Sequence, residues 1–132
     1  GFPTEDEAMF RNSLALVEEC GLTFLHVFTF SARHGTPAAK MPQVPGDVRR
    51  ERAARLRAAG EAALRRYFAD QIGRDVRVLV ERAQGEAVFG HSEHFAPVRI
   101  AAPMGSPGAD AGSVVRARIS AFTDRHLLAE AA

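Results

Sequence analysis

The residues with the clearest chemical potential lie in the loop that follows the apolar segment 22–30. Ser31, Arg33 and Thr36 bring two hydroxyl groups and a guanidinium into one short turn. An arginine at the carboxyl end of a strand can bind a carboxylate through two parallel hydrogen bonds, so the loop is a candidate ligand site. The structural alternative is a loop that its own hydroxyl groups tie down, with Arg33 in a surface ion pair.

A second set of candidates lies between residues 71 and 132, where cationic and aromatic side chains alternate with apolar ones. Barrels of the OB type bind nucleic acid through a basic groove and aromatic side chains on which bases stack. The RNA-binding candidates are Arg77, His91, His94, Phe95, Arg99, Arg116 and Arg118. Seven acidic residues balance seven arginines in this range, so we expect binding guided by shape rather than by a strong positive field. As the alternative, His91 and His94 are ordinary surface histidines, too few for a metal site without further ligands.

The segment 47–66 is strongly basic, with seven arginines against three acidic residues. This excess of positive charge could attract RNA phosphates, and Arg50, Arg57 and Arg65 are the candidates for such contacts. No single helical stripe collects all the arginines, so a simple solvated face is the alternative.

Composition narrows the class of protein. The chain has 132 residues, a net charge of +1 and 46% hydrophobic residues, as in a globular protein. No apolar run reaches the roughly 18 residues of a membrane span, so we expect a cytoplasmic protein without membrane contact. Cys20 is the only cysteine, which excludes an intrachain disulfide or a cysteine-bound cluster within these residues. No triad, phosphate-binding glycine loop or pair of carboxylates stands out, so no catalytic residue is expected in this chain.

The elements that must position these groups divide into two halves. Thr4 and Glu7 form a capping-box pattern before a helix over 5–20, and residues 22–30 read as a buried strand. Turn residues fill 31–46, and Asp47 is expected to cap a helix running to about Ala69. Gly60 inside this helix indicates a bend or a tight contact.

From residue 73 onward the pattern alternates as in strands. Short strands are expected at 76–80, 88–90, 97–100, 114–119 and 126–129, with a mobile loop over 101–112. Five such strands indicate a small antiparallel barrel of the OB-like kind.

Two motifs resemble late motifs of the radical-SAM methylthiotransferases. They are Gly1-Phe2-Pro3-Thr4-Glu5 and Phe28-Thr29-Phe30-Ser31-Ala32-Arg33-His34-Gly35-Thr36-Pro37-Ala38. Two weaker segments, 78–81 and 90–98, lie where that family has a small β-domain called TRAM. Phe30 stands where the family usually has Tyr, so a hydroxyl-dependent role is lost there.

Within the family, the resemblance is greatest to enzymes that act on N6-threonylcarbamoyladenosine beside the tRNA anticodon. It implies an intact enzyme that uses two 4Fe-4S clusters and S-adenosylmethionine to insert a methylthio group at C2 of the adenine. It also implies that five residues at the barrel rim surround the cofactor and substrate pocket: Thr4, Glu5, Ser31, Arg33 and Thr36. The expected partner is the tRNA anticodon stem-loop. Because the cluster cysteines are not in this chain, we expect a catalytically silent C-terminal piece without bound cofactors that helps to hold the tRNA.

The resemblance therefore predicts an α+β chain in three parts. Residues 1–46 would be the truncated βαβ end of a radical-SAM barrel, 47–70 a basic connector helix, and 71–132 the TRAM barrel. Alternatives remain: a methylthiotransferase for isopentenyladenosine in tRNA or for a ribosomal-protein aspartate, a stand-alone RNA-binding module, or a protein–protein module. An unpaired strand at 22–30 could also mediate a non-physiological dimer.

Overall fold

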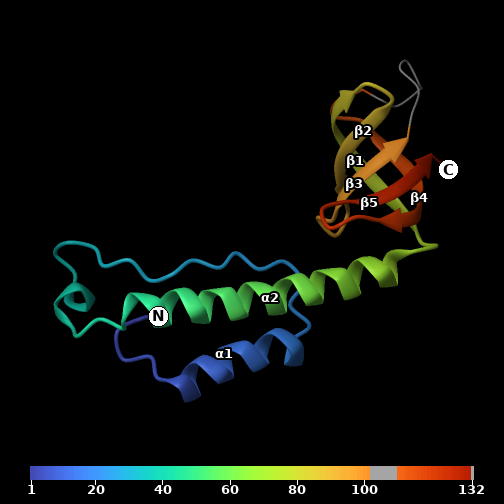
Figure 1. The fold of residues 1–132 in the computed structure, drawn as a ribbon. Coiled ribbons are helices and arrows are strands. Elements are labelled where there is room, and N and C mark those ends of the chain that lie inside the picture. The colour runs from blue at the N-terminus through green and yellow to red at the C-terminus, as the bar shows by residue number, and fades with distance from the viewer. Residues whose placement is uncertain (102–109, 132) are drawn as a thin grey trace. The chain divides into compact units, whose positions relative to one another are not determined.

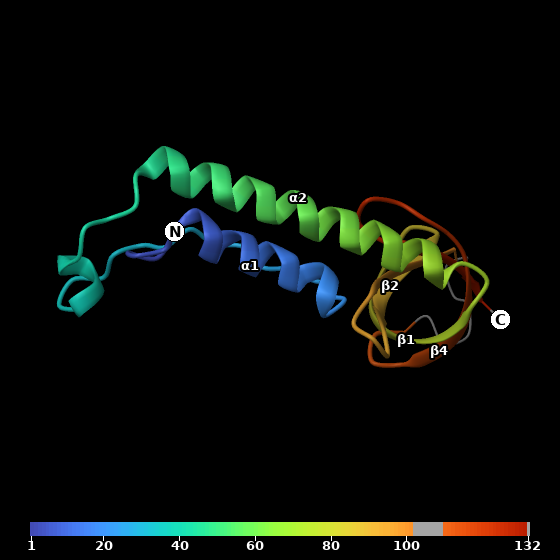
Figure 2. The same cartoon turned by 90° about the horizontal axis from the view of Figure 1, so that it is seen from below.

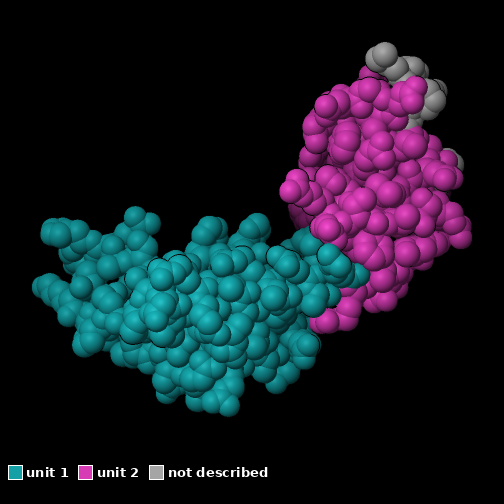
Figure 3. Space-filling view, in the orientation of Figure 1, with its two compact units in different colours: residues 1–65 teal, residues 66–132 magenta. Residues whose placement is uncertain are grey.

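The computed structural model describes residues 1–101 and 110–131 (Figure 1). The chain separates into two compact units, residues 1–65 and 66–132, and the division falls within the long helix α2 (Gly46–Gln71) (Figure 3). The division of the chain into barrel remnant, connector helix and TRAM barrel stays a prediction.

The first helix, α1 (Glu7–Glu19), forms because apolar residues recur at helical spacing and bury Phe10 and Val17. Its N-cap is Asp6, whose side chain accepts a hydrogen bond from the Met9 amide at 2.8 Å. The expected capping by Thr4 is therefore wrong, because Thr4 lies in a preceding turn. The expected stop is confirmed at Gly21, which has a positive φ of 60° just after the C-cap.

Residues 22–30 are extended but form no strand, so the expected strand is not present among the described residues. Figures 1 and 2 both show this segment running alongside α2, and Figure 1 shows it on the opposite side of α2 from α1. The exposure of its side chains alternates as in a strand, with Leu25 and Val27 half-buried and Phe28 87% exposed. A Cβ on Gly60 would lie 3.2 Å from the Leu25 Cβ, so Gly60 permits the tight contact that was expected there. A short 3-10 helix, η1 (Pro37–Lys40), follows in the loop.

The helix α2 begins one residue before Asp47, which therefore lies in its first turn instead of capping it. Alanine and arginine have high helix propensity, so the segment is helical even though its apolar residues define only a weak stripe. Within unit 2, the last turns of α2 supply Phe68, which is fully buried against the barrel residue Phe122 with ring centroids 6.0 Å apart.

The rest of unit 2 is a closed barrel of five strands: β1 (Asp75–Gln84), β2 (Ala87–Ser92), β3 (Pro97–Ala101), β4 (Val114–Phe122) and β5 (Leu127–Ala131). Its strand order is β1-β2-β3-β5-β4, and Figure 2 looks into the ring. Four of the neighbouring pairs are antiparallel, but β3 and β5 are parallel. The expectation of an antiparallel barrel is thus corrected: closing the ring joins two strands that run in the same direction.

The barrel interior is filled by alternate apolar residues, as the period of two requires. The fully buried ones include Val78, Val98, Ile100, Ile119 and Leu127. Position 90 in β2 requires glycine because the β1 backbone lies too close for a side chain: a Cβ there would lie 1.9 Å from the Leu79 carbonyl oxygen. The expected mobile loop over 101–112 lies mostly outside the described residues.

Candidate nucleic-acid interface and the two loop motifs

The two motifs of the N-terminal half meet in unit 1. The Phe2 and Phe30 rings pack edge to face with centroids 5.3 Å apart, which brings the start of the chain beside the end of the extended segment. Arg49 of α2 donates a hydrogen bond from Nη1 to the Phe30 carbonyl at 2.8 Å. The loop that carries Ser31, Arg33 and Thr36 therefore begins next to the first motif.

In the first motif, Glu5 forms an ion pair with Arg52. The buried Arg52 donates from Nη1 to both the Glu5 carboxylate and the Glu5 carbonyl, each at 2.9 Å. Burial acts to raise the pKa of Glu5, but hydrogen bonds and positive charges from the Gly1 ammonium and Arg52 outweigh it and lower the pKa. Thr4 adopts a positive φ of 89° in the turn before α1, a strained conformation for a β-branched residue.

In the second motif, Thr36 also has a structural role. Its hydroxyl donates to the Arg33 carbonyl at 2.8 Å and accepts from the Ala39 amide at 3.3 Å, so it caps η1. Ser31 and Arg33 are exposed, and within the described residues neither side chain has a hydrogen bond or ion pair. Thr4 is exposed as well, and its hydroxyl has no hydrogen bond among the described residues, so three of the five rim candidates present free polar groups.

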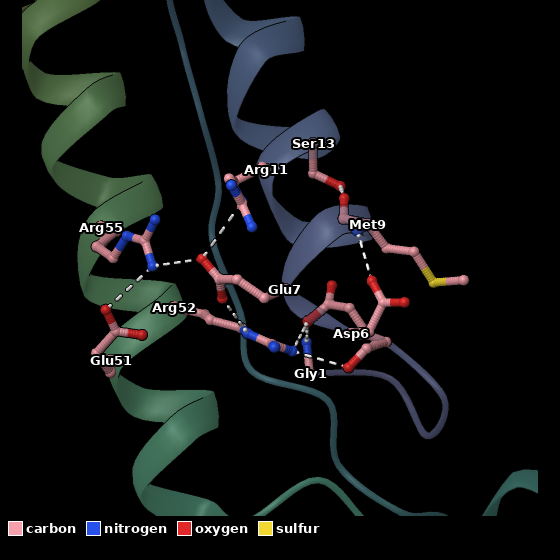
Figure 4. Close-up of polar contacts among 10 residues, drawn as sticks. Gly1, Asp6, Glu7, Met9, Arg11, Ser13, Glu51, Arg52 and Arg55 are labelled. Carbon is pink, nitrogen blue, oxygen red and sulfur yellow. Dashed lines mark hydrogen bonds and ion pairs between the residues drawn. The ribbon is translucent and has the colours of Figure 1, made fainter.

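Several arginines of α2 hold unit 1 together. Arg55 donates from Nη1 to Glu7 at 3.0 Å and to Glu51 at 3.3 Å, and its guanidinium lies 4.7 Å from the centre of the Phe10 ring (Figure 4). The hydrogen bond to Glu7 raises the pKa of Arg55. Arg55, one of the excess arginines of α2, therefore binds α1 and is not simply a solvated surface charge.

The arginines proposed for RNA contact on α2 lie elsewhere on the helix. Arg65 is exposed. Arg50 and Arg57 are exposed as well. Arg57 lines an open groove of about 260 Å³ in unit 1, together with Phe24, Leu25 and Leu64. These two guanidinium groups are accessible, in contrast to those of Arg52 and Arg49.

On the barrel, the four candidate arginines fall into two classes. Arg77 and Arg118 are engaged by carboxylates: Arg77 Nε lies 3.9 Å from Glu93 Oε1, and Arg118 Nη1 lies 3.5 Å from Asp75 Oδ1. Arg99 on β3 and Arg116 on β4 are exposed, and the part of the chain that the structure describes offers them no ion pair. These two cations are the ones available to phosphate.

The turn between β2 and β3 presents an aromatic side chain to solvent. Phe95 is 81% exposed and has a positive φ of 60°, which is uncommon for a bulky residue. The turn is fixed by the Ser92 hydroxyl, which accepts from the amides of His94 at 3.3 Å and Ala96 at 3.2 Å. The turn therefore holds a large ring in solvent in a strained backbone conformation.

His91 directly precedes that turn, on β2, where it pairs with Pro97 of β3. Its Nδ1 is 2.8 Å from Glu81 Oε1. Its interaction is therefore with a carboxylate of β1, and it is not joined to His94 in a common site.

A further cluster on the barrel was not anticipated from the sequence. The Arg82 guanidinium lies 4.4 Å from the centre of the Phe89 ring, and His126 packs edge to face on that ring at 5.8 Å. A bulge between Val80 and Arg82 changes the register of β1 where Arg82 begins its pairing with Phe89. One signal was present: Phe89 stands between the buried Val88 and Gly90, as an outward residue of a strand does.

The residues of this chain do not fit an iron–sulfur cluster, which takes several cysteine thiolates. Cys20 is the sole cysteine and is exposed at the end of α1. Residues 1–101 and 110–131 contain no group of three or more His, Cys, Asp or Glu side chains arranged to hold a metal ion. In the same ranges, no helix is both long and apolar enough to cross a membrane.

Curated relatives match most of the chain, and three of them show the range of their names. The threonylcarbamoyladenosine tRNA methylthiotransferase MtaB of Rickettsia prowazekii is 46% identical over 100 residues, 76% of this chain and 23% of its own. The ribosomal protein uS12 methylthiotransferase RimO of Desulforudis audaxviator is 40% identical over 91% of this chain and 27% of its own. The tRNA-2-methylthio-N(6)-dimethylallyladenosine synthase of Bifidobacterium adolescentis is 35% identical over 98% of this chain and 28% of its own.

All three relatives are methylthio-transferring enzymes that differ in substrate. The chain belongs to the radical-SAM methylthiotransferase family. It spans about a quarter of the length of these relatives. No family model matches the chain. Among solved structures, the apo form of Mycoplasma genitalium RNase R aligns with 65% of this chain and 17% of its own at 10% identity, with a TM-score of 0.45, too low to assign a common fold.

Proposed function

We propose that this chain is the C-terminal part of a tRNA methylthiotransferase that acts at C2 of N6-threonylcarbamoyladenosine next to the anticodon. The observation that carries the proposal is the 46% identity to a relative with that substrate in its name. The three relatives differ in the substrate that each name gives. The sequence identities of this chain to the other two relatives are lower, at 40% and 35%.

Within this function, residues 66–132 would be a TRAM domain that holds the tRNA anticodon stem-loop. Three features of the described surface support that role: the uncommitted arginines Arg99 and Arg116, the exposed ring of Phe95, and a barrel of OB-like size. Four further residues would border this RNA contact: Arg77, Arg118, His91 and His94. The first three already interact with carboxylates. We expect the enzyme to work in the cytoplasm, where tRNA is modified.

Residues 1–46 would form part of the barrel wall around S-adenosylmethionine. The free polar groups of Ser31 and Arg33 could face a ligand there, since an arginine can bind a carboxylate through two hydrogen bonds. Glu5 and Thr36 would support this wall through their contacts with Arg52 and Ala39. S-adenosylmethionine and the two clusters would supply the radical chemistry, and the cluster cysteines would come from outside these 132 residues. The chain alone is therefore expected to be inactive.

The substrate assignment is tested with the full-length protein that contains this chain. It is expressed in a bacterial strain that lacks methylthiotransferases, and tRNA nucleosides are then measured by mass spectrometry. Appearance of the methylthio derivative of N6-threonylcarbamoyladenosine supports the proposal. Methylthiolation of the dimethylallyl nucleoside, or of ribosomal protein uS12, in its place would contradict it and favour one of the other two relatives' substrates.

A further inference from the structure

The cluster of Arg82, Phe89 and His126 lies on the outer surface of the barrel. We propose that it is a nucleotide-binding site, in which one unpaired base of an RNA stacks on the Arg82 guanidinium while its phosphates contact Arg99 and Arg125. The inference rests on the proposed RNA-binding function and assigns part of it to residues that neither the motifs nor the relatives single out.

The contacts of Arg82 hold its planar guanidinium in place as a surface on which a base can stack, called the platform below. Arg82 lies over the Phe89 ring at 4.4 Å, and its Nη1 donates to the Gln84 side chain at 3.1 Å. His126 packs against the same ring in a T-shaped arrangement, with ring centroids 5.8 Å apart. An arginine held by an aromatic ring on one face keeps its other face for a flat partner, and bases stack on guanidinium planes as they do on aromatic rings.

Positive charge gathers around this platform. Arg99 is the direct partner of Phe89 in the pairing of β2 with β3, and Arg125 precedes His126 in the chain. Burial lowers the pKa of His126, and the charges of Arg82, Arg125, Arg99 and His91 lower it further, as expected where cations lie close together.

Carboxylates do not cancel this charge. Within the described ranges, Arg99 and Arg125 form no ion pair. Glu81 is the acidic residue on this part of β1, and it is engaged by His91 at 2.8 Å. The site therefore pairs a stacking surface with unneutralised cations.

This combination favours a nucleotide over an acidic peptide. A peptide carboxylate would satisfy Arg99 and Arg125 but would leave the stacked guanidinium without a planar partner. A single-stranded nucleotide offers both a flat base and a phosphate within one unit, which is how single strands are bound on barrels of this size.

The test measures fluorescence anisotropy of the full chain with two labelled probes. One is an oligoadenylate of about eight nucleotides, and the other is an abasic ribose-phosphate oligomer of about the same length. Arg82→Lys keeps the charge but removes the planar surface, and Arg74→Lys makes the same change at an exposed arginine just before β1 as the matched control. Phe89→Leu removes the ring that holds Arg82, and circular dichroism confirms that each variant folds.

Arg82→Lys should weaken oligoadenylate binding about tenfold and change binding of the abasic oligomer by less than about twofold. Arg74→Lys should leave both affinities nearly unchanged. Equal affinities of Arg82→Lys and the natural chain for oligoadenylate, or an equal loss on both probes, would overturn the stacking site while leaving RNA binding intact. Failure of the natural chain to bind oligoadenylate would overturn the site as well, and binding to the anticodon stem-loop then decides the proposed function separately.

Discussion

Neutralising the two uncommitted arginines of the barrel should change how RNA binding depends on salt. The perturbation is the double variant Arg99→Gln and Arg116→Gln, because both guanidinium groups are exposed and without an ion pair in the described part of the chain. The matched control is Arg77→Gln with Arg118→Gln, which removes the same charge from groups that already contact Glu93 and Asp75.

The magnitude follows from counterion release. Each phosphate contact to single-stranded RNA contributes about 0.7 to the slope of log affinity against log salt. Losing two contacts should therefore reduce the slope by about 1.4. Between about 50 and 200 mM salt, the gap in affinity between the natural chain and the variant should shrink about sevenfold.

The assay is anisotropy of a labelled anticodon stem-loop across that salt range. The control pair should change the slope by less than half as much, since its charge is already shared with carboxylates and exposed ion pairs are weak. If both pairs lower the slope equally, the distinction between free and engaged arginines is wrong, and the barrel acts only through its total charge.

Two further predictions concern stability. Gly90→Ala places a Cβ 1.9 Å from the Leu79 carbonyl oxygen and should destabilise the barrel by about 3 kcal/mol or more, measured by urea unfolding. The control is Gly85→Asn, at a positive φ with open space, which should cost less than about 1 kcal/mol. Equal losses of stability in the two variants would show that the close approach at Gly90 is not limiting. Arg52→Met removes the guanidinium partner of Glu5, which then keeps only the Gly1 ammonium at 2.8 Å, and should reduce protection of α1 amides in hydrogen exchange by about 2 kcal/mol while barrel amides keep theirs. Because the folded-state pKa of Glu5 is lowered, this contribution is complete above its usual pKa of about 4.3 and disappears as the pH falls through the folded-state value. Protection of α1 that is the same in the variant and the natural chain, at neutral and acidic pH, would contradict the role of this pair.

Much of the fold follows from local patterns. The periodic residues Phe10 and Val17 predict α1, and alternation around Val78 predicts β1. The capping residue was misplaced because Thr4 and Asp6 are both good N-caps, and only the turn geometry selects Asp6. The parallel pairing of β3 with β5 depends on ring closure between distant strands, which no local pattern reports.

The extended segment 22–30 shows most clearly which feature local sequence does not determine, namely strand pairing. Its apolar, β-branched sequence and alternating exposure are those of a strand, yet strand formation requires hydrogen-bonded neighbours. Leu25 packs on Gly60 of α2, but no neighbouring strand is present among the described residues. Local sequence fixes the extended backbone, whereas pairing depends on other chain segments.

The candidate site was predictable in part. Arg99, Arg116 and Phe95 could be selected as outward or turn residues of short strands, and the structure leaves all three exposed. It could not be foreseen that carboxylates engage Arg77 and Arg118 but not Arg99 and Arg116, because this depends on the positions of the acidic residues in the folded barrel. The contact of Phe89 with His126 joins residues far apart in the chain and needs the closed barrel to exist.

The most direct test of the account is binding of this chain to a tRNA anticodon stem-loop and to a scrambled hairpin of the same length and composition. Binding to the anticodon stem-loop should be tighter, with a difference that persists as salt is raised, because shape and stacking are less sensitive to salt than charge. Equal affinity for both hairpins with a steep salt dependence, or binding to neither, would contradict the proposal that this barrel holds the anticodon region.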